Sequence, residues 1–261
     1  MKAVGYQQPG AIDRADALID IEIARPAPTG RDLLVEVQAV AVNPVDTKVR
    51  RSAAPPEGEY KVLGYDAVGI VRETGPDATL FRPGDAVWYA GAIDRAGSNA
   101  EFQLVDERLV GRKPSSLSPA DAAALPLTGI TAWELLFDRL KVPLAGEGRP
   151  GTLLIVGAAG GVGSILIQLA RQRTGLTVVG TASRPESRAW ALALGAQGVA
   201  GMENPYERLK ELTRGRRIGQ AELVEFVREL GLPADVEERF VALTPATYVG
   251  LAPQLVRTYL D

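Results

Sequence analysis

The first 115 residues consist of short apolar runs separated by Pro and Gly, a pattern that favours β-structure. Between Leu33 and Ala41 apolar side chains occupy every second position, which is the period of a strand with one better-buried face. Further strands are predicted at residues 68–73, 86–90 and 101–106, with a turn at 81–85. The N-terminal part of the chain is therefore predicted to be a β domain.

From Ser118 the apolar period becomes helical, and Ser118 is an N-cap residue followed by Pro119 at the first helical position. A second helix is predicted at 131–140. After a connector rich in Pro and Gly, predicted strands at 153–156 and 177–181 alternate with predicted helices at 161–172 and 185–194. This alternation is the beginning of a doubly wound α/β sheet. No further strand is predicted after residue 181.

After about residue 200 the chain is richer in charged side chains and its pattern is helical to the end. Asn204 and Pro205 supply an N-cap and a first-turn proline. Residues 220–230 predict an amphipathic helix, and two more helices are predicted at 234–243 and 246–260. The apolar face of the first of these helices contains Leu223, Phe226, Val227 and Leu230. The predicted fold class is α/β plus β: a β domain, a partial α/β unit and a helical C-terminal tail.

The composition excludes several kinds of chemistry, because the 261 residues include neither Cys nor His. Thiolate and imidazole groups bind nearly all protein zinc, so no metal site is predicted. Nucleophile arrangements that depend on His are excluded as well. Proton transfer must therefore use a carboxylate, Tyr, Lys or solvent.

The net charge of −3 gives no support for counterion-driven binding to nucleic acid or to an anionic membrane. The first seven residues lack the apolar stretch of a signal peptide, so a cytoplasmic protein is expected. Residues 151–170 carry no charge and are long enough to cross a bilayer. Four glycines between Gly157 and Gly163 favour instead a turn between a strand and a helix.

This glycine turn is the strongest local signal, because it lies between a predicted strand and an apolar helix. Glycines allow the backbone to approach a pyrophosphate, and the N–H groups of the helix N-terminus are donors for its oxygens. We expect a dinucleotide to bind here; the alternative is a turn that only tightens packing between helix and sheet. The expected contacts are Ala158, Gly160, Gly161, Val162 and Gly163.

The end of the second α/β strand indicates which dinucleotide binds. A site for NAD usually has an acid there, whereas a 2′-phosphate needs hydroxyls and cations. This chain has Ser183 and Arg184, with Arg188 one helical turn later. The expected cofactor is NADPH; in the alternative interpretation both arginines are ordinary solvated residues at a helix start.

Several motifs in order resemble the medium-chain dehydrogenase/reductase superfamily, and within it the zinc-independent quinone-oxidoreductase branch often labelled zinc-type alcohol dehydrogenase-like. The motifs are Asn43-Pro44-Val45-Asp46, the segments 63–69, 82–87 and 124–132, and the glycine turn, which together cover residues 1 to about 197. The resemblance implies a GroES-like β domain packed against a Rossmann domain, with a small-molecule substrate bound in the cleft between them.

In zinc-binding relatives the positions of Gly64-Tyr65-Asp66 are Gly-His-Glu, so this chain differs where a metal ligand would be. Without a metal, hydrogen-bond donors must stabilise the substrate oxygen that becomes enolate-like. By position in the motif, Asn43 is the first candidate for substrate contact, followed by Asp46 and Tyr65. Each has a structural alternative, such as a turn former or a helix N-cap.

In the same family, hydroxyl groups line the nicotinamide pocket, and Thr128 and Thr131 resemble them. Both residues belong to the motif at 124–132. They complete the expected cofactor contacts.

The resemblance ends near residue 200, where the third strand of a Rossmann sheet is expected. The segments 202–215 and 243–252 resemble instead the C-terminal end of an adenylosuccinate lyase. The general-acid His of that family cannot be present, so lyase activity is not expected. The expected domains are a GroES-like substrate domain at 1–125, a partial Rossmann domain at 126–200, and a lyase-like helical tail at 201–261.

Three hypotheses follow. The first is an NADPH-dependent, zinc-independent oxidoreductase that transfers hydride to a quinone or an α,β-unsaturated carbonyl. The second is an inert or nucleotide-binding chimera with a truncated Rossmann domain. In the third, residues 150–261 associate with another chain, and a homo-oligomer stays open as an alternative.

Overall fold

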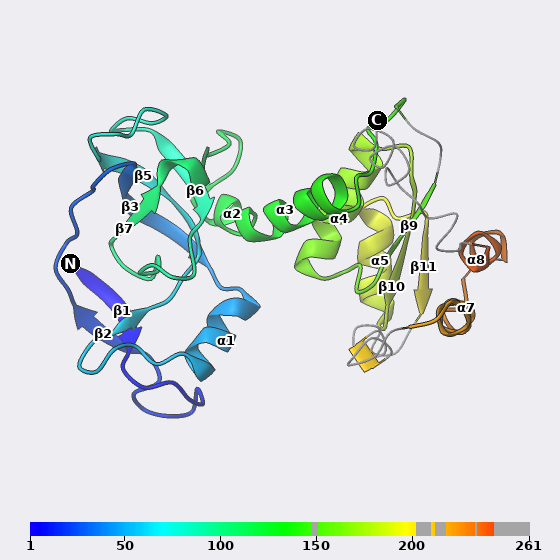
Figure 1. Ribbon diagram of the computed structural model, residues 1–261, viewed down its shortest axis with the longest axis horizontal. Coiled ribbons are helices and arrows are strands. Elements are labelled where there is room, and N and C mark those ends of the chain that lie inside the picture. The colour runs from blue at the N-terminus through cyan, green and yellow to red at the C-terminus, as the bar shows by residue number, and fades with distance from the viewer. Residues whose placement is uncertain (148–150, 202–209, 212–217, 233, 243–261) are drawn as a thin grey trace, which may run out of the picture. The chain divides into compact units, whose positions relative to one another are not determined.

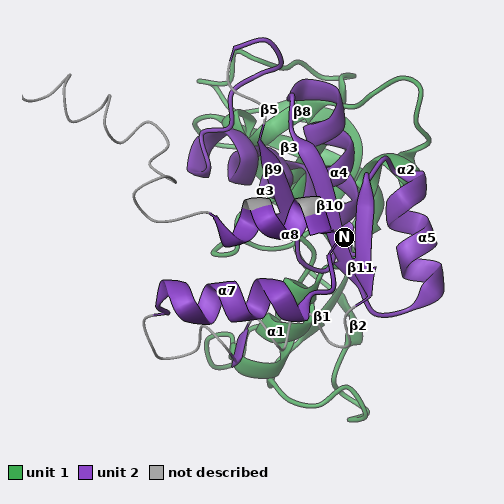
Figure 2. Ribbon diagram, turned by 90° about the vertical axis from the view of Figure 1, so that its right-hand side faces the viewer, with its two compact units in different colours: residues 1–127 green, residues 128–261 purple. Residues whose placement is uncertain are grey.

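The computed structural model describes residues 1–147, 151–201, 210–211, 218–232 and 234–242. The chain divides into two compact units, Met1–Leu127 and Thr128–Asp261 (Figure 2). The first unit is mainly antiparallel β-structure and the second is α/β (Figure 1). The predicted N-cap at Asn204 and the predicted helix at 246–260 lie outside the described residues.

Unit 1 contains two antiparallel sheets, with strand orders β7-β3-β5-β6-β8 and β2-β1-β4. The bounds of the first sheet are β7 Phe102–Asp106, β3 Asp32–Ala41, β5 Asp66–Thr74, β6 Ala86–Ala90 and β8 Val110–Arg112. Those of the second are β2 Ile19–Glu22, β1 Lys2–Tyr6 and β4 Lys61–Val62. The helical elements are α1 Pro44–Ser52, the 3₁₀-helix η1 Glu107–Leu109 and α2 Pro119–Ala123. The predicted strands at 33–41, 68–73, 86–90 and 101–106 all fall on this framework.

Alternating side chains of β3 and β5 form the main core of unit 1. Leu33 and Val35 pack with Val71 and Val87, and all four are buried. Gly69 of β5 lies so close to the backbone of Glu36 that any side chain would collide with it. The glycine therefore allows the backbones of β3 and β5 to approach closely at this point.

Unit 2 contains a parallel sheet of order β11-β10-β9, formed by β9 Thr152–Ile155, β10 Thr177–Ala182 and β11 Gly198–Gly201. Its helices are α3 Pro126–Trp133, which begins just before the unit boundary, the π-helix η2 Glu134–Arg139, α4 Gly161–Arg173, α5 Pro185–Ala193, α7 Gln220–Glu229 and α8 Ala234–Val241. The uncharged segment 151–170 is thus divided between a strand, a turn and a helix. No helix among the described residues is long and apolar enough to cross a membrane.

The third strand corrects the sequence analysis, in which no strand followed residue 181. Gly198 pairs with Val179 and Gly201 with Ala182, so β11 extends the sheet in parallel. Two of its four residues are glycines, which have low strand propensity. Tertiary pairing with β10 therefore overrides a weak local signal.

Helices cover both faces of this short sheet, because adjacent residues of β10 point to opposite sides. Val178 packs against Leu166 and Ile167 of α4, and Val179 packs against Phe226 and Val227 of α7. Leu230 and Leu232 complete the second cluster together with Val236 of α8. Figure 1 shows α7 and α8 beside β11 and away from α4.

Leu223 belongs to the apolar face predicted for the helix at 220–230, but the sheet does not cover it. Its side chain is 45% exposed, whereas Phe226, Val227 and Leu230 are buried as predicted. Leu223 lies in the first turn of α7, beyond the part of the helix that the sheet covers. The apolar face of α7 predicted from the sequence is therefore one turn longer than the surface that packs on the sheet.

Candidate functional site

In unit 1, Asp46 joins two segments that are distant in sequence. One of its carboxylate oxygens accepts the backbone N–H of Asn43 at 2.8 Å, and the other accepts the backbone N–H of Gly64 at 3.0 Å. Gly64 has a φ of +103°, and a Cβ there would lie 2.5 Å from the hydroxyl of Ser98. Asp46 thus fixes the backbone immediately before Tyr65.

Asp66 has a similar role on the other side of Tyr65. Its carboxylate is fully buried and accepts the side-chain amide of Asn43 and the backbone N–H of Leu127, both at 2.8 Å. Burial raises the pKa of the Asp66 carboxyl, although both hydrogen bonds act in the opposite direction. No local pattern in the sequence indicates the bond between Asp66 and Asn43, because the two residues are 23 positions apart.

Tyr65 differs from these neighbours because its polar group has no partner among the described residues. Only 4% of the residue is exposed, and no described residue forms a hydrogen bond with its hydroxyl. Among the described residues, every fully buried side-chain oxygen has a hydrogen-bond partner. The Tyr65 hydroxyl has none, so it is not fully buried and must reach solvent. Burial raises the pKa of the Tyr65 hydroxyl, and the charge of Asp46 raises it further. The group is a neutral donor at physiological pH.

The structure therefore brings the predicted residues Asn43, Asp46 and Tyr65 together, but in different environments. Asn43 is only 8% exposed and directs its amide nitrogen at Asp66. Asp46 directs both oxygens at backbone N–H groups. Of these three side chains, only Tyr65 has a polar group that forms no hydrogen bond with a described residue and is therefore available to a ligand.

We expect that Asp46→Asn lowers the free energy of unfolding by about 2 kcal/mol. Both carboxylate oxygens of Asp46 face fixed backbone N–H groups. In either orientation, the NH₂ group of the new asparagine therefore faces one of these backbone N–H groups, and that hydrogen bond is lost. Urea unfolding of the two proteins measures the difference. Asp13→Asn is the matched control, since Asp13 is exposed and has no hydrogen bond among the described residues. Equal stability of Asp46→Asn and Asp13→Asn would contradict this assignment.

In unit 2 the glycine turn connects β9 to α4. The N–H groups of Gly157 and Ala158 donate to the side-chain and backbone oxygens of Thr181, at 3.1 and 3.0 Å. A Cβ on Gly163 would lie 2.7 Å from the carbonyl oxygens of both residues. The helix start therefore fits closely under the turn only because position 163 has no side chain.

The first turn of α4 has an open N-terminus. Gly160 is the N-cap residue and has no side chain to accept the N–H groups that follow. No described residue accepts the N–H groups of residues 161–163. Unpaired donors at the positive end of a 13-residue helix favour an anion. These residues include most of the contacts predicted for a pyrophosphate.

The predicted 2′-phosphate residues lie at the carboxyl end of the same sheet. Ser183 and Arg184 follow β10 directly and are exposed. Arg188 of α5 lies against Gly201, where any side chain would collide with its guanidinium. Neither arginine forms an ion pair with a carboxylate of the described residues, unlike Arg31, Arg72 and Arg95 in unit 1. Their charges are available to an anion.

The two predicted threonines occupy one face of α3. The methyl group of Thr128 would lie 3.1 Å from a Cβ on Gly161, so Thr128 is next to the glycine turn. Thr131 is exposed one turn later. The structure thus brings Thr128, but not Thr131, to a glycine of the turn.

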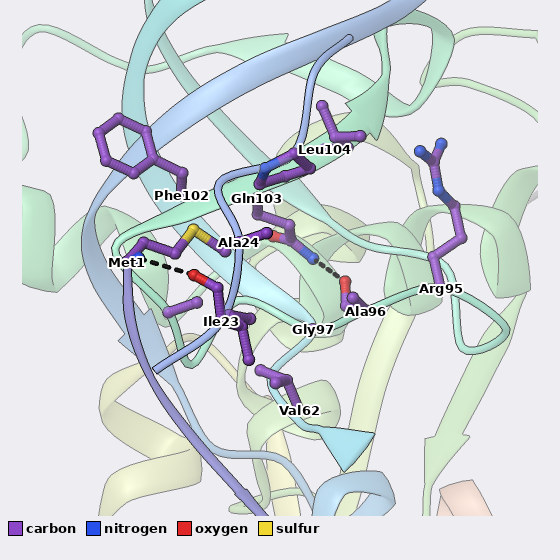
Figure 3. A pocket seen from close by; sticks show the side chains of 12 residues that line it. Met1, Ile23, Ala24, Val62, Arg95, Ala96, Gly97, Phe102, Gln103 and Leu104 are labelled. Carbon is purple, nitrogen blue, oxygen red and sulfur yellow. Dashed lines mark hydrogen bonds between the residues drawn. The ribbon is translucent and has the colours of Figure 1, made fainter. Parts of the chain in front are cut away.

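Unit 1 also contains a cavity of about 240 Å³ that the sequence analysis did not anticipate (Figure 3). Its walls are mostly apolar, with side chains such as Met1, Val62 and Phe102. Gln103 donates to the carbonyl of Ala96 at 3.0 Å and accepts the Tyr89 hydroxyl at 2.9 Å. None of the predicted site residues lines this cavity.

The antiparallel unit has a GroES-like fold, and the parallel unit is a partial Rossmann fold with a glycine turn at its first strand. The family model of the alcohol dehydrogenase GroES-like domain matches residues 29–115. The model of the adenylosuccinate lyase C-terminal domain matches residues 193–249. The N-terminal part of the chain and its C-terminal part therefore match models of two different families.

Among curated proteins, a zinc-type alcohol dehydrogenase-like protein of Staphylococcus aureus is 46% identical over 205 residues, covering 76% of this chain and 59% of that protein. Among solved structures, a putative zinc-dependent alcohol dehydrogenase of Rhizobium etli is 63% identical, with a TM-score of 0.71 and coverage of 76% and 58%. Escherichia coli quinone oxidoreductase, solved with NADPH, is 29% identical, with a TM-score of 0.65 and coverage of 84% and 64%.

Over the aligned three quarters of its length, the chain belongs to the medium-chain dehydrogenase/reductase superfamily. It spans less than two thirds of the length of the relatives named above. The lyase-like residues 193–249 include β11, α7 and α8, so this segment completes the sheet and covers its second face.

Two of these relatives have names that mention zinc, whereas this chain contains no Cys or His. By the family resemblance, Tyr65 stands at the position where zinc-binding relatives have His. In the described part of the chain, no three Asp or Glu side chains are grouped so that they would hold a metal ion. Zinc independence stays a prediction from the sequence.

Proposed function

We propose that this protein is an NADPH-dependent, zinc-independent oxidoreductase that reduces a quinone or an α,β-unsaturated carbonyl compound. The observation that carries the proposal is the glycine turn, with three N–H groups at the start of α4 that no described residue accepts and no room for a side chain at Gly163. Superfamily membership and the relative solved with NADPH support it.

The residues present fit the proposed cofactor. The N–H groups of residues 161–163 would hold the pyrophosphate, with Thr128 beside them. Ser183, Arg184 and Arg188 would hold the 2′-phosphate, because two cations without an ion pair to any described carboxylate lie where an NAD site usually has an acid. When bound, NADPH supplies the hydride.

The proposed substrate donor is the Tyr65 hydroxyl. Reduction of an enone places negative charge on the carbonyl oxygen, and a hydrogen bond from a neutral donor stabilises that charge. Tyr65 keeps its proton because burial and Asp46 both raise its pKa. Asn43 and Asp46 act on the reaction through position: Asp46 accepts the backbone N–H of Gly64, and Asn43 donates to the carboxylate of Asp66, so each binds a residue next to Tyr65. The final proton comes from solvent.

Oxidation of NADPH by a panel of quinones and enones tests the proposal. We expect turnover with at least one acceptor, and about a 100-fold lower kcat for Tyr65→Phe, the usual cost of losing one such donor. The pKa of Tyr65 lies above its ordinary value of about 10, so its hydroxyl keeps the proton at neutral pH. The ratio of the wild-type kcat to the Tyr65→Phe kcat should therefore be constant from about pH 6 to 9. It should shrink only above about pH 10, where the wild-type hydroxyl loses its proton.

Tyr60→Phe is the matched control, since Tyr60 is an exposed tyrosine five residues earlier and should leave kcat unchanged. Absence of turnover with every acceptor would contradict the proposed activity. Equal rates for wild type and Tyr65→Phe would contradict only the role of the Tyr65 hydroxyl and not the proposed activity.

The second candidate function is nucleotide binding without turnover. It is favoured by the lyase-like segment, because β11 is the last strand of this sheet among the described residues and the helices α7 and α8 follow it. NADPH binding in calorimetry together with no oxidation of NADPH by any acceptor would identify this case.

A further inference from the structure

We infer that the apolar cavity of unit 1 is a binding site for a small neutral molecule of the size of a fused bicyclic aromatic compound. The cavity has a volume of about 240 Å³, and the residues proposed to contact cofactor and substrate are not among those that line it. The inference is therefore independent of the proposed function, and its test does not depend on turnover.

The cavity lies where the two sheets of unit 1 meet. Val62 of β4 belongs to the smaller sheet and Phe102 of β7 to the larger one, and residues 95–97 form a further wall (Figure 3). An isolated β-bridge joins Ala3 of β1 to Ala100, which also lines the cavity. Contacts between the two sheets therefore shape the site.

Backbone hydrogen bonds hold these walls in place without a ligand. The N-terminal amine of Met1 donates to the carbonyl of Ile23 at 2.7 Å, and the N–H of Ile23 donates back to the carbonyl of Met1 at 3.0 Å. The N–H of Gly97 donates to the carbonyl of Val62 at 3.0 Å. A Cβ on Gly97 would lie 2.2 Å from the backbone of Leu63, so this wall packs directly on the segment behind it. A cavity with fixed walls binds a ligand without the cost of ordering them.

The chemistry of the walls selects a neutral ligand. Among the described residues that line the cavity, the polar side chains are those of Arg95 and Gln103. The guanidinium of Arg95 donates to both carboxylate oxygens of Asp32, at 2.8 and 3.0 Å, so its charge is already balanced. The amide of Gln103 donates to the carbonyl of Ala96, as Figure 3 shows, and accepts the hydroxyl of Tyr89. A charged ligand would lose its hydration beside groups that are already paired.

The volume sets the size of the ligand. An apolar protein cavity of about 150 Å³ binds benzene, so about 240 Å³ accommodates a second fused ring. Phe102 supplies an aromatic wall, and the guanidinium of Arg25 lies 4.4 Å from the centre of its ring and holds it in place. Aromatic rings pack on one another in offset or edge-to-face geometry. Indole, which is neutral and bicyclic, is therefore a suitable probe.

Calorimetry on the full chain tests the site with three probes that have the same number of non-hydrogen atoms: indole, benzoate and benzamidine. We expect indole to bind with a dissociation constant of about 1 mM or lower. Benzoate, an anion, and benzamidine, a cation, should each bind at least about tenfold more weakly than indole.

Two variants locate the bound indole. Ala24→Leu and Ala96→Leu place a larger side chain on different walls of the cavity, and each should weaken indole binding by at least about tenfold. Both alanines are exposed, so the added atoms do not overpack the core. Ala27→Leu is the matched control, since Ala27 is exposed as well and is not one of the lining residues. Thermal unfolding checks that all three variants stay folded.

Absence of indole binding to the wild type would overturn the inference. Indole binding that is unchanged in both folded cavity variants would overturn it too, because the ligand would then bind elsewhere. Benzoate or benzamidine binding as tightly as indole would contradict the neutral class of ligand. If indole gives no heat and Ala24→Leu changes the particle mass in light scattering, a second copy of the chain covers the cavity instead.

Discussion

Gly163→Ala should weaken NADPH binding by at least about tenfold, equivalent to about 1.4 kcal/mol. The new Cβ would lie 2.7 Å from the carbonyl oxygens of Gly157 and Ala158, which are backbone atoms and cannot rotate away. The helix start must therefore move from the turn, and its N–H groups lose their position. Overpacking of this kind costs about 1–3 kcal/mol. Isothermal titration calorimetry measures the change.

Gly175→Ala is the matched control in the same unit, because a Cβ at Gly175 meets no atom within 4 Å. It should bind NADPH like the wild type. Thermal unfolding of both variants separates a local effect on the turn from loss of the fold. Undiminished NADPH binding by a folded Gly163→Ala protein would show that the cofactor does not use this turn.

Leu230→Ala should lower the free energy of unfolding of unit 2 by about 3 kcal/mol. Leu230 is 1% exposed and packs with Val179 and Ala200 of the sheet. Truncating it leaves a cavity under the C-terminal end of α7. Urea unfolding measures the difference.

Leu223→Ala is the same substitution in the same helix at a side chain that is 45% exposed, and should cost less than about 1 kcal/mol. The contrast between the two positions distinguishes an integral element of unit 2 from a solvated appendage. Equal stability of the two variants would mean that α7 does not pack on the sheet in solution.

Much of the framework was predictable because its signals are local. The alternation at Leu33–Ala41 and the breaks around it predict β3, and the N-cap residue Ser118 predicts the start of α2. The glycine turn is also local, since strand, glycines and helix follow one another within about twenty residues. These features needed no knowledge of distant residues.

The arrangement around Tyr65 was not predictable in this way. Its description depends on a bond from Gly64 to Asp46, 18 residues earlier, and on a bond from Leu127 to Asp66, 61 residues earlier. Asn43 and Asp46 are turn and cap residues by sequence, and only the fold shows that their bonds leave the Tyr65 hydroxyl as the one available to a ligand.

The sequence alone determined that this protein has no thiol or imidazole chemistry, that its first three quarters resemble a dehydrogenase, and that a glycine turn follows one strand. These are properties of residue identity and of short spacing. Only the tertiary structure decided that residues 198–201 become a third strand and that α7 and α8 cover the second face of the sheet. The physical reason is that a glycine-rich strand and an amphipathic helix gain their stability from partners that are remote in sequence.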